Sequence, residues 1–414
     1  MISRLSVTSW VLYDLANTNF SMGIVSLYFS LYVLDVSGAG NADRHYGYTN
    51  AVSMGIIFIL SPLLGALTDR APRRVPFLTV STLICVGFTA LLGQGLWPSL
   101  VFFVIANIAY QAGLQFYDAL LPEVSTEENR GWIGGVGVGV GYFGSFIAIG
   151  TGMVMLEKLH TGWPAVFQVI AAEFLVFALP AFFWIRERGN PDARPFSTAA
   201  IREAFHQVIE TLRNSQRYPG LFRFLIGRVF YTDAVNTVIA IMGLYVTSVA
   251  VRAGYAAEKG KAMAQLIMLV AVTCAVVSGF VWGRIVDRIG SKRTLDYVLY
   301  LWMVVLVAAA LFGLFSLPLS LFYLIAAGAG IAMSGGNAAD RILMLRLAPP
   351  ERIGEFYGLY GMVGRFSAIT GPLLWGIIVG ELFRGRPDIG QPVGILVMAA
   401  MVVVGYWVLR PVRD

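Results

Sequence analysis

Long apolar runs separated by short polar connections dominate the chain. Each run is bounded by charged residues, Pro or Gly. The runs fall near residues 6–34, 47–68, 75–95, 98–120, 131–156, 163–186, 220–250, 263–285, 294–316, 319–342, 354–382 and 391–410. A bilayer core about 30 Å thick needs roughly 20 apolar residues for each helical crossing. The pattern therefore predicts an all-α integral membrane protein with twelve transmembrane helices.

One long polar segment, residues 187–219, divides the chain near its middle. At helical spacing it carries Ile201, Phe205, Val208, Ile209 and Leu212. This spacing predicts an amphipathic helix that lies on the cytoplasmic face. We expect a six-helix bundle over residues 1–186, a linker with this helix over 187–219, and a second six-helix bundle over 220–414.

The two predicted bundles share polar motifs about 220 residues apart. The first bundle carries Asp14, Asn17 and Thr18 in its first helix, Gly65, Asp69 and Arg70 after its second, and Asp118 at the end of its fourth. The second bundle carries Asp233, Asn236 and Thr237, then Gly283, Asp287 and Arg288, then Asp340. One register relates the halves, and six helices per copy preserve orientation. We therefore expect parallel repeats related by an axis along the membrane normal.

Composition and charge support a membrane location. Hydrophobic residues make up 57% of the chain and charged residues 13%, and the formal net charge is +6. The basic residues concentrate in one set of alternating connections and do not form a patch with interleaved aromatics, which disfavours nucleic-acid binding. The positive-inside bias predicts that both termini are cytoplasmic, and we expect the bacterial inner membrane as the location.

The two loops of the form G-x-x-x-D-R resemble the signature loop of the major facilitator superfamily. Basic residues follow each copy, Arg73 and Arg74 in one case and Lys292 and Arg293 in the other. The small residues let helices approach closely, and Asp and Arg can pair across a cytoplasmic gate. A simpler interpretation is that Asp69 and Asp287 only anchor helix ends. We also assign Asp340 and Arg341 to this gating set.

Two segments resemble one branch of that superfamily, the branch named for the vacuolar amino-acid effluxer of autophagy. The residues that carry the resemblance are Tyr13, Asp14, Ala16 and Asn17, and then Gly335, Gly336, Arg341, Leu347, Pro350, Phe356, Tyr357, Gly358, Tyr360, Gly364, Arg365, Gly371 and Pro372. The chain departs from the branch at Asp340, where Ser is common, and at Arg365, where Lys is common. The resemblance implies a solute permease of the major facilitator fold.

Polar side chains recur on single faces of several predicted membrane helices, at steps of three and four residues. The fourth helix carries Asn107, Gln111, Gln115 and Asp118, and the tenth carries Ser334, Asn337 and Arg341. With the motifs of the first and seventh helices, these are the helices that line the cavity in the superfamily. We therefore expect Asn17, Asn107, Gln111, Gln115, Asp118, Asn236 and Asn337 to surround a hydrated chamber.

Charged side chains within the runs are the sharpest candidates for function, because each costs about 2.5 to 3.5 kcal/mol at the membrane centre. We expect Asp14 and Asp233 to serve proton or cation coupling, or else to bond Asn or Arg and stiffen a helix pair. Arg365 presents a planar fork suited to an anionic substrate group, or else forms an internal salt bridge. Arg228 is expected to pair with a carboxylate, and Glu173 to join a proton relay or to serve packing.

No enzyme constellation is visible. The three histidines lie in separate predicted loops, and the sequence contains neither a nucleophile elbow nor a phosphate-binding Gly-Lys-Ser loop. We expect no cofactor and no metal, a monomer in the lipid bilayer, and a small-molecule substrate with a proton or other cation. The function expected is secondary transport of a small polar or amphoteric solute. The alternatives are efflux of amphipathic drugs or lipids, and a receptor or scaffold that does not transport.

Overall fold

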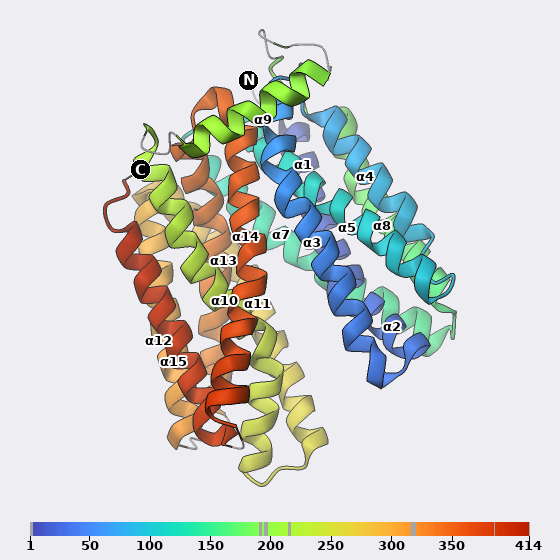
Figure 1. Cartoon of the computed structure of the whole chain (residues 1–414), viewed down its shortest axis with the longest axis vertical. Coiled ribbons are helices and arrows are strands. Elements are labelled where there is room, and N and C mark those ends of the chain that lie inside the picture. Colours follow the sequence, from blue (N-terminus) through green and yellow to red (C-terminus); the bar gives the residue numbers. More distant parts are fainter. Residues whose placement is uncertain are drawn as a thin grey trace. The chain divides into compact units, whose positions relative to one another are not determined.

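In the computed structural model, every secondary-structure element of the described residues is a helix (Figure 1). The structure describes residues 3–189, 193, 198–213, 217–315, 320–384 and 386–413. They divide into two compact units, Met1–Arg213 with Ala348–Met362, and Asn214–Leu347 with Val363–Asp414. The predicted boundaries at residues 187 and 219 stay a prediction.

The first unit holds a bundle of apolar helices and one polar helix. Its helices are α1 (Arg4–Phe20), η1 (Ser21–Tyr28), α2 (Phe29–Ser37), α3 (Ala39–Asp69), α4 (Val75–Ala90), α5 (Leu96–Ala119), α6 (Leu121–Val124), α7 (Arg130–Met153), η2 (Val154–Lys158), α8 (Trp163–Trp184) and α9 (Thr198–Arg213). The π-helical segment η1 joins α1 to α2 without a break, so these three form one long membrane helix.

The second unit is built from the same kind of helices. These are α10 (Pro219–Arg252), α11 (Ala257–Ile289), α12 (Ser291–Phe315), α13 (Leu321–Leu347) and α15 (Pro387–Leu409). Helix α14 (Ile353–Trp375) follows the short η4 (Pro350–Arg352) and continues as η5 (Gly376–Leu382). The division between the units passes through α14, after Met362.

The same helix pairs pack together inside each unit. In the first unit these are α1 with α8, α3 with α5, α4 with α5, and α4 with α8. In the second unit they are α10 with α15, α11 with α13, α12 with α13, and α12 with α15. Each pair occupies the matching position in its half of the chain. The contacts inside the two units therefore repeat, as the polar motifs of the sequence indicate.

Apolar length and composition agree with a membrane protein. Ten helices in the described part of the chain are long and apolar enough to span a bilayer, and α4 is a shorter apolar helix. Side chains such as Val80, Phe183 and Val304 are more than half exposed, which suits contact with lipid. The protein is thus an integral membrane protein, and the number of twelve crossings stays a prediction.

Glycines of α7 bring its backbone against α1. A methyl group built on Gly144 would lie 2.3 Å from the carbonyl oxygen of Leu15 and 2.7 Å from the amide nitrogen of Asn19. One on Gly152 would overlap the ring of Tyr28. Such close approach is the usual way that membrane helices gain van der Waals contact. The glycine-rich helix α7 thus meets the backbone of α1 directly.

Helix α9 is amphipathic, but its buried face differs from the predicted one. Ala204 is fully buried against Ala66 and Leu67 of α3, with Val208 beside it, whereas Phe205 is 55% exposed. The side chains of Ile201 and Leu212 lie outside the described residues. The buried face of α9 is shifted from the predicted one because the small Ala204 allows α9 to pack tightly on α3. The bulky Phe205 would prevent this.

Replacing Gly144 by Ala tests the close contact between α1 and α7. We expect Gly144→Ala to lower the free energy of unfolding by about 1 to 3 kcal/mol, because the added methyl group meets backbone atoms that cannot move aside. Thermal unfolding of the purified protein in detergent measures this. Gly150→Ala is the matched control, since no heavy atom lies within 4 Å of a methyl group at that position. Equal melting temperatures for the two variants would contradict the proposed contact.

Candidate functional site

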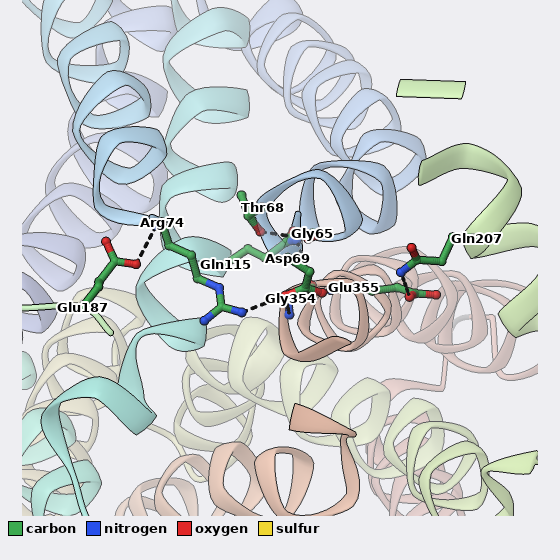
Figure 2. A network of polar contacts seen from close by, with 9 residues as sticks. All are labelled: Gly65, Thr68, Asp69, Arg74, Gln115, Glu187, Gln207, Gly354 and Glu355. Carbon is green, nitrogen blue, oxygen red and sulfur yellow. Dashed lines mark hydrogen bonds and ion pairs between the residues drawn. The ribbon is translucent and has the colours of Figure 1, made fainter. Parts of the chain in front are cut away.

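A carboxylate at the end of α3 binds the start of α14. Asp69 accepts the backbone N–H of Gly354 at 2.7 Å on one oxygen and that of Glu355 at 2.8 Å on the other (Figure 2). Arg74 donates to the same carboxylate at 2.8 Å. The first N–H groups of a helix lack partners within the helix and form the positive end of its dipole. Asp69 therefore caps α14 from another helix, and Arg74 balances its charge. All these residues belong to the first unit.

Small residues allow α3 and α14 to meet backbone to backbone at this cap. A methyl group built on Gly65 would lie 2.0 Å from the carbonyl oxygen of Gly354, and one on Gly358 would lie 2.5 Å from that of Ser61. Gln115 of α5 seals the contact, because its side chain accepts from the Ser61 hydroxyl at 2.5 Å and donates to the Ser61 carbonyl at 2.9 Å. Gly65, the glycine of the G-x-x-x-D-R loop, is thus required because no larger side chain fits between α3 and α14 at this point.

Helix α9 is tied to the same contact. Arg70 pairs with Glu203 of α9 at 2.5 Å and donates to Gln207 at 2.8 Å. Gln207 in turn donates to Glu355 at 2.6 Å, which is visible on the right of Figure 2. Arg70 therefore binds side chains of α9, whereas Arg74 binds the Asp69 carboxylate. The sequence did not distinguish these two arginines, and it gave no role to Gln207 or Glu355.

Glu187 anchors the segment after α8 to the start of α4. Its carboxylate accepts the backbone N–H of Arg74 at 2.5 Å and that of Val75 at 2.7 Å. Burial raises the pKa of the Glu187 carboxyl above its ordinary value, and the two N–H groups and the Arg74 charge oppose that rise. The sequence contained no signal for this residue beyond its position directly after an apolar helix. Glu187 thereby fixes the backbone from which the Arg74 side chain reaches Asp69.

The second G-x-x-x-D-R copy lies at the end of α11. Gly283 is buried, Asp287 is half-buried and Arg288 is exposed. Asp340, which the sequence assigns to the gating set, is instead buried in the second unit. It pairs with Arg228 at 2.8 Å and accepts the hydroxyl of Tyr231. The reason is that α13 continues for two more turns, to Leu347, so Asp340 does not close its helix. Arg341, the next residue, is half-buried.

A cavity of about 100 Å³ lies in the second unit between α10, α12 and α13. Four predicted residues line it, namely Arg228, Asn236, Asn337 and Asp340. Tyr231 and Trp302 also line it. Arg228 does pair with a carboxylate, that of Asp340, and its contact with substrate stays a prediction. The pair satisfies two charges that would otherwise be buried alone, and the space beside it has room for several water molecules.

Asp14 and Asp233 occupy matching positions in the two units. Asp14 lies on α1 beside two glycines of α7, and a methyl group built on Gly137 would lie 3.0 Å from one of its oxygens. Asp233 lies on α10, accepts the hydroxyl of Thr370 at 2.6 Å, and meets Gly371 of α14. Both aspartates are more than 90% buried. The repeated motif therefore sets a carboxylate against a glycine of a neighbouring helix in each unit.

Asn17 differs from the other polar residues of α1. It is 3% exposed, and neither its amide nitrogen nor its amide oxygen has a hydrogen-bond partner among the described residues. An unsatisfied buried polar group costs about 1 to 3 kcal/mol. Such a group is a natural contact for a polar solute or an ordered water molecule. Among the residues predicted to line the chamber, Asn17 has the clearest unmet capacity to bind.

The remaining predicted residues fall into different surroundings. Asn107 donates to Ser53 at 2.9 Å and to Asn50 at 3.2 Å, so it helps to hold α5 against α3. Glu173 of α8 accepts from Asn19 at 2.9 Å and from Thr151, and thereby links three helices. The others are Gln111, half-buried in α5, Asp118, buried in α5, and Arg365, buried in the part of α14 that belongs to the second unit. Solute contact by these residues stays a prediction.

Comparisons with known proteins agree with this helical architecture. The sequence model of a family described as "Vacuole effluxer Atg22 like" matches residues 41–410. The uncharacterized MFS-type transporter YxiO of Bacillus subtilis is 26% identical over 388 residues, which are 88% of this chain and 86% of that protein. Autophagy-related protein 22 of Neurospora crassa is 25% identical over 295 residues, which are 64% of this chain and only 37% of that longer protein.

Two solved structures share the fold. A bacterial homologue of the iron transporter ferroportin, in an outward-facing state, superimposes with a TM-score of 0.73 at 15% identity over 99% of both chains. A double-tryptophan mutant of XylE superimposes with a TM-score of 0.68 at 14% identity over 97% of this chain and 93% of the other. The predicted major facilitator fold is confirmed. At these identities the likeness is one of fold alone.

Removing the Asp69 carboxylate tests the cap on α14. We expect Asp69→Ala to speed amide hydrogen exchange at Gly354 and Glu355 by about fivefold, because a lost cap costs about 1 kcal/mol. Hydrogen exchange of the peptide covering residues 353–362, read by mass spectrometry, measures this. Glu351→Ala is the matched control, because Glu351 is an exposed acid close to the same helix start. If both variants exchange alike, Asp69 does not hold this helix.

Proposed function

Since this chain belongs to the family of Atg22-like vacuole effluxers, we propose that it moves a small polar or amphoteric solute across a membrane by alternating access, coupled to protons. It is a secondary transporter of the major facilitator superfamily and not an enzyme, in keeping with its relatives. The resemblance inferred from its motifs is thereby confirmed. The solute, the coupling and the bacterial inner membrane, with both termini cytoplasmic, are our proposal.

The observation that carries the proposal is the buried pair of polar residues in α1. Asp14 and Asn17 lie three residues apart on a helix that crosses the membrane, and both are more than 90% buried. A carboxylate in such a place is costly and is retained where it binds something. A proton on Asp14 would remove its charge, and the amide of Asn17 can donate to and accept from a solute at the same level. One turn of α1 thus offers a group that can bind a proton and a group that can bind the solute.

Asp233 is the proposed counterpart in the second unit. The hydroxyl of Thr370 stabilises one of its oxygens. The other oxygen has no side-chain hydrogen-bond partner in the described part of the chain. A carboxylate that is only partly satisfied in a poorly hydrated site can take up and release a proton as its surroundings change. With one such carboxylate at the repeated position of each unit, each unit could bind and release a proton.

Arg365 is the proposed contact for the negative group of the solute. It is 6% exposed and lies three turns into α14, well inside the predicted membrane segment. Its guanidinium has five donors in a planar fork, which matches a carboxylate better than the point charge of a lysine does. An amphoteric solute such as an amino acid would present its carboxylate to Arg365 and its polar remainder to amides.

The capped start of α14 supports alternating access. In this superfamily two helical bundles rock about a central site, which requires contacts that form in one state and break in another. The contact at Asp69 lies within the first unit and includes two hydrogen bonds to backbone N–H groups and a small-residue surface. Such a contact can separate and form again without repacking large side chains. We propose that it closes the cytoplasmic end of the pathway.

Neutralising Asp14 tests the proton coupling. A thermal-shift screen of amino acids, peptides, nucleosides and drugs first selects a solute, because a ligand of the native state raises its apparent stability. We then expect Asp14→Asn to abolish uptake of that solute driven by a pH gradient in proteoliposomes, with normal elution on size exclusion. Asp388→Asn, at an exposed acid, is the control and should keep full uptake. Full uptake by Asp14→Asn would remove Asp14 from the coupling role.

Removing the Arg365 charge tests substrate recognition. We expect Arg365→Ala to weaken binding of solutes that carry a carboxylate at least tenfold, and of matched solutes that lack one by less than twofold, because a charged hydrogen bond is worth about 1.5 to 3 kcal/mol. Equilibrium dissociation constants for an amino acid and for its carboxamide, which lacks the carboxylate, measure the difference. Arg365→Lys should restore part of the loss. Equal losses for solutes with and without a carboxylate would mean that Arg365 serves the fold. Preferred binding of amphipathic drugs would favour the alternative efflux function.

A further inference from the structure

A groove between α4 and α8 lies outside the proposed transport site. It has a volume of about 620 Å³ and is bounded by the start of α4 and the end of α8. Its apolar wall includes Val80, Phe182 and Phe183, and its polar end carries Arg73, Arg186 and Glu187. Both helices are apolar, and they pack against each other. The groove therefore runs from a hydrocarbon-like wall to a basic end.

The basic end of the groove has positive charge that the protein does not neutralise. Arg73 and Arg186 are exposed, and within the described chain neither guanidinium group has an ion-pair or hydrogen-bond partner. The one acid in the lining, Glu187, points both oxygens at the backbone N–H groups of Arg74 and Val75. Two free guanidinium groups thus face one space, and each is a good donor to phosphate oxygens.

The apolar side chains of the groove wall are exposed, and the acyl chains of lipids would cover them. Phe183 is 74% exposed and Val80 is 57% exposed. Trp184, next to Phe183, is 46% exposed at the end of α8, where an aromatic residue marks the level of lipid headgroups. The two arginines lie just beyond the ends of these apolar helices, in the position of the headgroup layer.

The walls of the groove are fixed by bonds within the protein. The Glu187 carboxylate ties the segment after α8 to the first residues of α4. The backbone N–H of Arg186 donates to Ser6 at 3.3 Å, which holds the same segment to α1. The backbone positions of both arginines are therefore set before any ligand arrives, which reduces the entropy lost on binding.

We propose that this groove binds one anionic phospholipid, with the phosphate on Arg73 and Arg186 and an acyl chain along Val80 and Phe183. Basic pockets between membrane helices on the cytoplasmic side are suited to anionic headgroups. The connections that contain these arginines are those predicted to be cytoplasmic, and the cytoplasmic leaflet is the one that is rich in anionic lipid. The groove does not depend on the proposed transport function, since none of the residues proposed to bind the solute or the proton lines it.

Native mass spectrometry of the full chain in detergent, titrated with dioleoyl phosphatidylglycerol, tests the proposal. We expect one tightly bound lipid, and at least fivefold weaker binding of dioleoyl phosphatidylcholine. Each arginine near the membrane surface contributes a factor of about five. We therefore expect Arg73→Gln with Arg186→Gln to weaken phosphatidylglycerol binding about 25-fold. Val80→Ser with Phe183→Ser should weaken both lipids alike, because it removes acyl contact and no charge.

The control is the double variant Arg410→Gln with Arg413→Gln. It removes the same charge from exposed arginines at the end of another membrane helix, α15, and should leave lipid binding unchanged. Size exclusion and thermal unfolding verify that all variants are folded. Equal binding by the groove variant and the control variant would overturn the proposal. So would equal affinity for the two lipids, or displacement of the lipid by millimolar inorganic phosphate, which would identify a site for a free anion.

Discussion

Polar groups inside a bilayer must find their partners within the protein, and this constraint explains most of the side-chain chemistry described above. A charge at the membrane centre costs at least about 2.5 to 3.5 kcal/mol, and an unmet hydrogen bond adds to that cost. Arg228 and Asp340 meet the constraint as a buried ion pair with Tyr231. Glu173 meets it by accepting from side chains of two other helices. Asp69 meets it at the end of α3 by capping the N–H groups of another helix.

Glycine and other small residues decide where these partners can meet. Asp69 reaches the backbone of α14 only because Gly65 and Gly354 let the two helices touch. In the same way Gly137 and Gly141 give Asp14 its place against α7, and Gly371 gives Asp233 its place against α14. Carboxylate and glycine thus occur together at three helix contacts. Contacts of this kind suit a transporter, because helices can part and meet again without repacking a core.

The sequence predicted the features that depend on local pattern. The apolar runs predicted the helices. The motif shared by Asp14 and Asp233 predicted that these two residues occupy matching positions in the two units. It could not predict the partner of Asp69, because Gly354 lies 285 residues away and backbone N–H groups leave no trace in the sequence. It could not separate Arg70 from Arg74, since this choice depends on where the chain turns between α3 and α4. Asp340 was misplaced because the helix end was set too early.

The residues predicted to line the chamber differ in how many hydrogen bonds their side chains form within the protein. The spacing of these residues along the sequence does not show this difference. Gln115 and Asn107 have the same helical face and the same chemistry, yet their donors are bonded to residues of α3. A solute could reach those donors only by breaking contacts that hold the bundle together. Asn17 is equally buried, and both of its polar atoms lack partners among the described residues. Since such a group is costly to retain without a ligand or water, Asn17 is a stronger candidate for the proposed solute contact than Gln115 or the amide nitrogen of Asn107.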